Sequence, residues 1–216
     1  MKRIRKSFIA SICLLTAFVV WTVAICFVDA RAIGPQGSSV GFAGVNGFVH
    51  TWTGVHLGLY HITDWLGLVP IFVCMGFGIL GLVQWIKRKS IRKVDYDILV
   101  LGGFYTVTIA AYLFFESVAI NYRPVLINGV LEASYPSSTT LLVMCVMPTA
   151  IMQLGSRIKN KVLRNIIAVT IIAFIAFMII GRLLSGVHWL TDIVGGMLLG
   201  TGLVMLYRAI AELKVE

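Results

Sequence analysis

Long apolar stretches alternate with short polar segments along the whole chain. Six of these stretches approach the ~20 residues that an α-helix needs to cross the hydrocarbon core of a bilayer. They cover residues 8–28, 66–86, 98–120, 138–155, 166–183 and 190–213. The pattern predicts an all-α integral membrane protein with six transmembrane helices, which forms a single membrane domain over residues 1–216.

The first apolar stretch follows the basic sequence MKRIRK, which resembles the start of a signal peptide. The residues Ala30 to Ala32 also resemble a cleavage site. The stretch is about 21 residues long, however, which is longer than the core of a typical signal peptide. We therefore expect it to be retained as the first membrane span.

Composition supports a membrane protein, because 59% of the residues are hydrophobic and only 12% are charged. In soluble domains about a quarter of the residues are charged. The four cysteines lie in or near the apolar spans, and no pair has the spacing of metal ligands. We therefore expect them to be packing residues, with neither a disulfide framework nor a metal site.

The basic residues predict the orientation of the bundle. Fifteen of the 18 lysines and arginines, Lys214 among them, fall on one side of a six-span arrangement. The positive-inside rule makes that side cytoplasmic and places both termini there. The net charge of +9 then reflects topology and contact with anionic headgroups, and it does not indicate a nucleic-acid partner. Only Arg31, Arg123 and Arg182 are left outside, where the rule disfavours them.

Residues 29–65 form the longest segment between spans and are predicted to be an outer interfacial loop. The glycine- and serine-rich part, residues 33–47, has the composition of a loop. The part that follows mixes aromatic residues with His50, His56 and His61, which indicates an amphipathic segment at the membrane surface. It serves either as an anchor or as a lid for a lipid. The histidine spacings of six and five residues do not match helical metal-ligand pairs.

The sequence RLLSGVHWLTD carries candidate chemistry between the last two spans. His188 and Asp192 share one helix face if a helix begins near His188. Asp192 can then hold one imidazole nitrogen while the other attacks an electrophile, and Arg182 can hold an oxyanion. The simpler interpretation is a histidine at the membrane edge with an aspartate as helix cap. The nearby arginine favours function, because ionisable clusters at span ends are usually functional.

Two further stretches complete a site. Arg123 follows the third span in the sequence NYRP, and PSST precedes the fourth span. Ser137 or Ser138 can cap the fourth helix, and the N-terminus of a helix also favours phosphate. Together these groups describe a metal-free site in which a histidine attacks phosphorus and arginines hold the equatorial oxygens.

These stretches resemble the motifs of the type-2 phosphatidic acid phosphatase superfamily, which is related to the vanadium haloperoxidases. The family motifs are Lys, six residues and Arg-Pro; Pro-Ser-Gly-His; and Ser-Arg, five residues, His, three residues and Asp. The corresponding stretches here are ESVAINYRP, PSST and GRLLSGVHWLTD, within residues 116–196. Their order and spacing match the family, as does the six-span topology.

The resemblance implies a phosphatase that needs no metal or other cofactor and works through a phosphohistidine. His188 would be the nucleophile, and Asp192 would orient it. The groups that would hold the phosphate are Arg123, Arg182, Ser137 and the backbone N–H of Ser138.

Three positions depart from the family pattern. Gly181 replaces the serine before the arginine of the third motif, and Glu116 replaces the lysine of the first motif. Glu116 precedes Arg123 by seven residues, so a continuous helix would place both on one face and let Glu116 orient Arg123. Thr139 replaces the histidine that protonates the leaving group in the family, and a threonine hydroxyl is too weak an acid for that role.

Three explanations of Thr139 remain open at this stage. The substrate is a diphosphate, whose leaving group needs less protonation than an alkoxide. Alternatively, another acid serves, with Glu116, His50, His56 and His61 as candidates. In the third explanation the protein binds lipid phosphates without efficient turnover.

The sequence therefore predicts a six-helix bundle in a bacterial plasma membrane, with an active site at the outer face. Its substrate and partners would be membrane lipids. We favour hydrolysis of a polyprenyl diphosphate such as undecaprenyl diphosphate, a carrier that is recycled in cell-wall synthesis. Phosphatidic acid and phosphatidylglycerol phosphate are alternative substrates. The alternative functions are a lipid phosphotransferase and a non-catalytic protein that binds or transports lipid phosphates.

Overall fold

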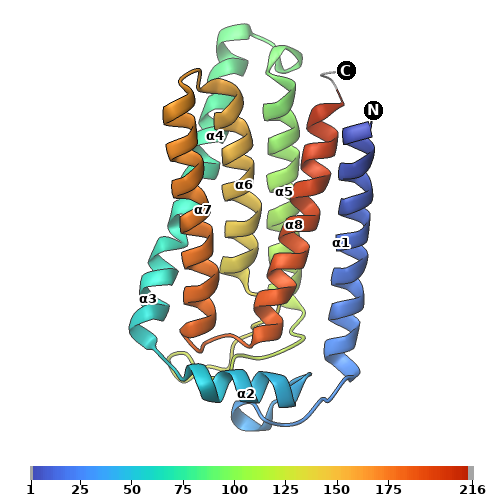
Figure 1. Cartoon of the computed structure of the whole chain (residues 1–216), viewed down its shortest axis with the longest axis vertical. Coiled ribbons are helices and arrows are strands. Elements are labelled where there is room, and N and C mark those ends of the chain that lie inside the picture. The colour runs from blue at the N-terminus through green and yellow to red at the C-terminus, as the bar shows by residue number, and fades with distance from the viewer. Residues whose placement is uncertain (1, 214–216) are drawn as a thin grey trace.

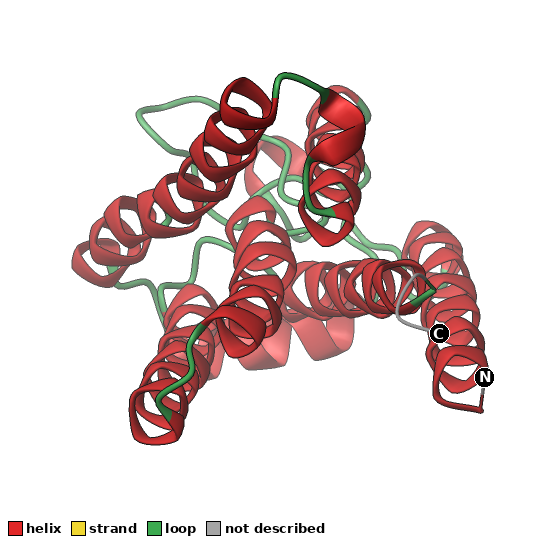
Figure 2. Cartoon of the chain, turned by 90° about the horizontal axis from the view of Figure 1, so that it is seen from above, coloured by secondary structure: helices red, strands yellow, loops and turns green. Residues whose placement is uncertain are grey.

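The computed structural model describes residues 2–213, which form helices joined by loops and no strand (Figure 2). The long helices are α1 (Lys2–Phe27), α4 (Leu68–Arg88), α5 (Tyr96–Ser117), α6 (Ser138–Arg157), α7 (Lys161–Leu184) and α8 (Leu190–Glu212). The short helices are α2 (Ala43–Thr53) and α3 (Leu57–Leu66), with 3-10 turns η1 (Pro35–Gly37) and η2 (Ile91–Lys93). The long helices run side by side as one bundle (Figure 1).

Six helical segments are long and apolar enough to cross a membrane, which confirms the predicted all-α architecture with six spans. The second span begins earlier than predicted, at Leu57 rather than Leu66. Gly67, between α3 and α4, keeps near-helical backbone angles of φ −60° and ψ −18°. The two helices therefore follow one another as a single span of 32 residues, Leu57–Arg88.

The start of α1 and the end of α8 lie at the same end of the bundle (Figure 1). This arrangement is what an even number of spans requires. Lys214, which contributed to the predicted orientation, lies outside the described residues. The assignment of this end to the cytoplasm remains a prediction.

Helix α8 packs between α1 and α6 in the interior of the bundle. Small residues permit this close approach, as in many membrane helix pairs. A Cβ atom on Gly200 would lie 2.6 Å from the side chain of Met144, and one on Gly202 would lie 2.9 Å from Leu15. The two helices with the most buried spans, α6 and α8, are also those that begin at the predicted site.

The segment predicted as an outer interfacial loop is largely helical. The loop predicted for residues 33–47 is wrong from Ala43 onward, where α2 begins. Helix α2 lies across the end of the bundle opposite the termini (Figure 1). The buried Asn46 donates hydrogen bonds to the carbonyl of Gly41 (2.8 Å) and to Oγ1 of Thr191 on α8 (2.9 Å). Composition could not reveal this helix, because a contact with a residue far along the chain holds it in place.

Candidate active site

A polar cavity of about 190 Å³ lies at the bundle end covered by α2, where α5 ends and α6 and α8 begin. Its lining includes the predicted site residues Arg123, Ser138 and His188, together with Glu116 and Asp64. These residues come from segments spread over more than half of the chain. The fold therefore gathers the separate motifs of the sequence around one small polar space.

His188 lies in the short connection between α7 and α8 and is almost fully buried. Its Nε2 atom is 2.9 Å from Nη2 of Arg182. A guanidinium can only donate hydrogen bonds, so Nε2 accepts and carries the lone pair, while Nδ1 carries the hydrogen. Nδ1 faces Oδ2 of Asp192 at 3.7 Å. The imidazole is thus held in the tautomer whose Nε2 can act as a nucleophile.

Asp192 is fully buried in the first turn of α8 and is held at both carboxylate oxygens. Oδ2 accepts a hydrogen bond from the backbone N–H of Trp189 (2.9 Å), and Oδ1 accepts one from Nδ2 of Asn121 (3.2 Å). Helix α8 begins at Leu190, so His188 and Asp192 do not share a helix face as expected. The carboxylate instead caps the start of the helix and faces back toward the imidazole.

Two guanidinium groups gather over one aromatic ring. The Cζ atoms of Arg123 and Arg182 lie 5.8 and 5.1 Å from the ring centroid of Tyr60. Within residues 2–213, Nε and Nη1 of Arg182 and Nη1 of Arg123 are buried without a hydrogen-bond partner. Buried donors in folded proteins are nearly always paired, so these groups are suited to an anion with several acceptor oxygens.

The electrostatic environment favours a neutral His188. Burial in the first place, and then the positive charges of Arg182 and Arg123, lower the pKa of His188 well below its ordinary value of 6.5. Both effects disfavour the imidazolium form. The site therefore favours the neutral imidazole of His188 at neutral pH.

The three polar residues after Pro136 lie in different places. Ser137 caps α6, because its Oγ accepts a hydrogen bond from the backbone N–H of Thr140 (3.5 Å). The same Oγ accepts from the hydroxyl of Thr140 (3.1 Å), and the backbone N–H of Ser137 donates to the carbonyl of Asp192 (3.0 Å). Ser138 lines the cavity. In the described part of the chain Thr139 is not among the lining residues, and its methyl group faces the α3–α4 junction at Gly67.

Glu116 and Arg123 are not related by a helix, so the expectation of a shared helix face is wrong. Helix α5 ends at Ser117, and the chain leaves the helical path before it reaches Arg123. Nε of Arg123 lies 3.0 Å from Oε2 of Glu132 instead. Both Glu116 and Arg123 nevertheless line the same cavity.

The histidines of the outer segment are occupied elsewhere. Nε2 of His50 lies 3.1 Å from the carbonyl oxygen of Gly186, and Nε2 of His56 lies 2.9 Å from that of Thr53. His61 packs against the ring of Tyr60, with 5.1 Å between centroids. Among residues 2–213, none of the three histidines is a lining residue of the polar cavity.

The sequence reasoning missed Asp64 and Asn121. Oδ1 of Asp64 lies 3.7 Å from Nη1 of Arg182, and Asn121 holds Asp192 as described above. A signal for Asp64 existed, because it is the one acidic residue in the span Leu57–Arg88, and a lone intramembrane carboxylate indicates function. The signal was lost because the span was predicted to begin after it.

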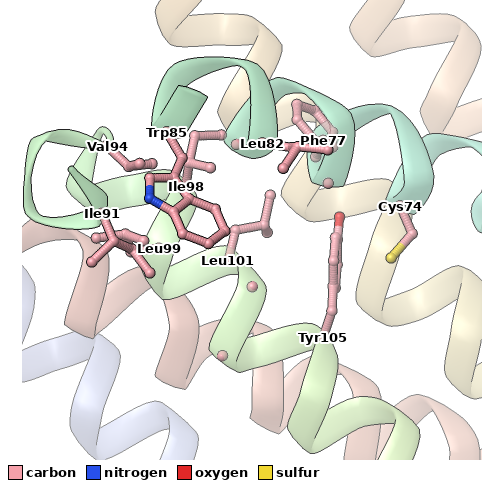
Figure 3. Close-up of a pocket in the computed structure, with 14 residues that line it drawn as sticks. Cys74, Phe77, Leu82, Trp85, Ile91, Val94, Ile98, Leu99, Leu101 and Tyr105 are labelled. Atoms are coloured by element: carbon pink, nitrogen blue, oxygen red, sulfur yellow. The ribbon is translucent and has the colours of Figure 1, made fainter. Parts of the chain in front are cut away.

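A larger cavity of about 510 Å³ lies between α4 and α5, toward the opposite end of the bundle. Figure 3 shows its apolar lining, with Cys74 and Phe77 from α4 and with Leu101 and Tyr105 from α5. None of the predicted site residues lines this cavity. The smaller polar cavity, and not this larger one, therefore holds the candidate chemistry.

Comparisons with known proteins identify the family of the chain and proteins that share its fold. The model of the PAP2 superfamily matches residues 99–215, a stretch that contains Arg123, Ser138 and His188. The crystal structure of "the first transmembrane PAP2 type phosphatidylglycerolphosphate phosphatase from Bacillus subtilis" is similar to this chain with a TM-score of 0.64 and 19% identity. The similarity covers 95% of this chain and 97% of that chain, and it shows a shared fold. No curated protein sequence matches the chain.

The family match covers more than half of the chain, and it includes all three motifs. It confirms the predicted class of enzyme, a membrane lipid phosphatase. The structural similarity confirms the multi-pass helical architecture. Family membership explains the order and spacing of the polar motifs, and the chain belongs to the PAP2 superfamily.

Proposed function

We propose that this membrane phosphatase hydrolyses the phosphate group of a lipid in the cavity lined by His188, through a phosphohistidine intermediate. One observation carries the proposal. Unpaired buried donors of two arginines lie beside the unprotonated Nε2 of a histidine whose other nitrogen faces a buried carboxylate. This set supplies an anion site, a nucleophile and a group that stabilises the imidazolium.

In the first step, Nε2 of His188 attacks phosphorus, and the bond between phosphorus and the leaving oxygen breaks. The hydrogen bond from Arg182 to Nε2 is replaced by hydrogen bonds to phosphoryl oxygens, which are stronger acceptors. Asp192 stabilises the positive charge that the imidazole acquires. Arg123 and Arg182 hold the equatorial oxygens as charge develops on them, with Ser138 at the start of α6 beside them.

In the second step, water attacks the phosphohistidine. The N–P bond breaks, inorganic phosphate leaves, and the imidazole returns to its neutral form. The lowered pKa of His188 supports both steps, because it favours the free nucleophile before attack and a good leaving nitrogen afterwards.

The substrate that we favour is a polyprenyl diphosphate such as undecaprenyl diphosphate. Thr139 stands where the family carries its acid histidine, and it does not line the cavity. A phosphate leaving group needs less protonation than an alkoxide, so a diphosphate tolerates this replacement. Phosphatidylglycerol phosphate is the second candidate, because a phosphatase named for it shares the fold.

The orientation that we propose places the cavity at the extracytoplasmic face of the plasma membrane. Basic residues such as Arg88, Arg92 and Arg157 lie at the ends of helices away from the cavity. The positive-inside rule therefore supports a cytoplasmic position for those ends. Labelling of single cysteines introduced beside Glu132 and beside Arg92, with a membrane-impermeant reagent on intact cells, tests the orientation.

A phosphate-release assay with purified protein, in the presence of a chelator, tests the reaction. We expect phosphate release from at least one of undecaprenyl diphosphate, phosphatidic acid and phosphatidylglycerol phosphate. The same panel identifies the substrate class. His188→Ala should abolish release, and an unchanged rate in that variant would show that the catalytic assignment is wrong. Binding of lipid phosphates without release by the native protein would favour the non-catalytic alternative.

A further inference from the structure

We propose that Asp64 on α3 is the general acid of this phosphatase. It would supply the proton that the leaving group receives from a histidine of the second motif elsewhere in the family. The inference rests on the proposed function, because it assumes attack by His188 on a lipid phosphate. It adds a residue that lies outside the three motifs and outside the region matched by the family model, residues 99–215.

The position of Asp64 relative to the nucleophile is the first support. Asp64 lines the polar cavity together with His188. Its Oδ1 atom is 3.7 Å from Nη1 of Arg182, and Nη2 of the same guanidinium is 2.9 Å from Nε2 of His188. One planar group thus lies between the nucleophilic nitrogen and the carboxylate. The side chain of Asp64 is 57% exposed, so it can reach a ligand in the cavity.

This arrangement fits the geometry of phosphoryl transfer. The attacking and leaving atoms lie roughly in line on opposite sides of phosphorus, with the three equatorial oxygens between them. A guanidinium that holds equatorial oxygens therefore lies beside that line. Nη2 of Arg182 bonds to the nucleophile and Nη1 faces Asp64, so Asp64 is the carboxylate that we assign to the side of the leaving oxygen.

The second support is the neighbourhood of Thr139. The carbonyl of Asp64 accepts a hydrogen bond from the N–H of Gly67 (3.0 Å). The methyl carbon of Thr139 lies 3.6 Å from the position that a Cβ on Gly67 would take. Helix α3 thus carries Asp64 within one turn of Gly67, the residue that the methyl group of Thr139 faces. An acid from α3 replaces the acid that α6 lacks.

The other candidate acids are placed less well. Glu116 lines the cavity, but in the described part of the chain no ion pair joins it to Arg123 or Arg182. The outer histidines are bonded to backbone carbonyls or packed on Tyr60, away from the cavity lining. Asp64 is the carboxylate that shares a guanidinium with the nucleophile.

The proton balance of the step is simple. The first step begins with Asp64 in its protonated form beside the bound phosphate. As the N–P bond forms and the P–O bond breaks, the carboxyl proton passes to the leaving oxygen. In the second step the carboxylate takes a proton from the attacking water. With an acid in this place, an alkoxide can leave as the alcohol. The substrate class therefore includes lipid phosphomonoesters as well as diphosphates.

Leaving-group dependence tests the assignment. The probes are phosphatidic acid, whose alkoxide leaving group needs a proton, and p-nitrophenyl phosphate, whose nitrophenolate does not. For Asp64→Asn we expect a loss of about a hundredfold or more in kcat on phosphatidic acid, with little change on p-nitrophenyl phosphate. The alkaline limb of the pH profile on phosphatidic acid should disappear as well. Retained activity on the aryl substrate also shows that the variant is folded.

Two results would overturn the proposal. One is an equal effect of Asp64→Asn on both substrates, including no effect on either. The other is a selective loss in Glu116→Gln with Asp64→Asn unaffected, which would make Glu116 the acid. The His188→Ala variant distinguishes a failure of the proposed function from a failure of the role proposed for Asp64. If it still hydrolyses p-nitrophenyl phosphate, the proposed function fails, whereas a dead His188→Ala with an unselective Asp64→Asn refutes only the role of Asp64.

Discussion

Nη2 of Arg182 donates a hydrogen bond to Nε2 of His188 over 2.9 Å, in a site where both side chains are buried. The arginine therefore occupies the nitrogen that we propose as the nucleophile. A phosphate group competes for the same guanidinium, because its charged oxygens accept hydrogen bonds more strongly than an imidazole does. Binding of the phosphate would thus release the lone pair that attacks it, which couples recognition to activation.

Replacement of Arg182 by lysine tests this coupling. A lysine ammonium keeps the charge but cannot contact the nucleophile, the phosphate and Asp64 with one planar group. We expect kcat/KM for Arg182→Lys to fall by about a hundredfold or more. The matched control is Arg31→Lys, because Arg31 is exposed and pairs with Asp29 (2.8 Å) away from the cavity. Equal losses in both variants would contradict the role of Arg182.

The pH dependence of the reaction should reflect the lowered pKa of His188. A group whose pKa is lowered in the folded protein stays unprotonated as the pH falls through its ordinary value of 6.5. We therefore expect kcat/KM on p-nitrophenyl phosphate, corrected for ionisation of the substrate, to stay level as the pH falls through this value. An acid limb with its midpoint at or above 6.5 would contradict this expectation.

Asn121 should act through Asp192. Its side-chain amide is buried and donates to Oδ1 of Asp192 (3.2 Å), which fixes the carboxylate that faces His188. Loss of a hydrogen bond to a charged group costs about 1.5–3 kcal/mol, so Asn121→Ala should lower kcat about tenfold or more. KM should stay close to the native value, because Asn121 does not line the cavity. A higher KM with an unchanged kcat would place Asn121 in substrate binding instead.

The connection that carries His188 depends on Gly186. Its φ angle is +69°, and a Cβ atom there would lie 2.1 Å from the carbonyl oxygen of Gly54. Gly186→Ala should therefore destabilise the protein by roughly 1–3 kcal/mol and reduce activity. The control is Gly102→Ala on α5, where a Cβ would meet nothing within 4 Å. Thermal unfolding in detergent should show a lower Tm for Gly186→Ala and an unchanged or higher Tm for Gly102→Ala.

A histidine at position 139 offers a gain of function. In the Asp64→Asn background, Thr139→His restores the residue type that the family uses to protonate the leaving group. We expect the double variant to recover part of the lost kcat on phosphatidic acid, with no gain on p-nitrophenyl phosphate. A gain of equal size on both substrates would mean that the new histidine acts on binding or stability rather than as an acid.

Much of this protein follows from the sequence itself. The lengths of the apolar stretches determine six spans, because a helix must satisfy its own backbone within a bilayer. The motifs around Arg123, Ser138 and His188 identify the family and the candidate site, because each motif is local and its residue types suit phosphate chemistry. The tautomer of His188 can also be predicted from the sequence, because its partners Arg182 and Asp192 lie within six residues of it.

Only the tertiary structure reveals which distant groups meet. Asp64 reaches Arg182 because α3 extends the second span toward α7, and the apolar pattern does not mark that extension. Arg123 pairs with Glu132 rather than Glu116 because α5 ends at Ser117. These relations depend on where helices stop and how they pack, which are set by contacts between residues far apart along the chain. The sequence determines the spans and the candidate nucleophile, and the packing of the bundle brings Asp64 beside Arg182.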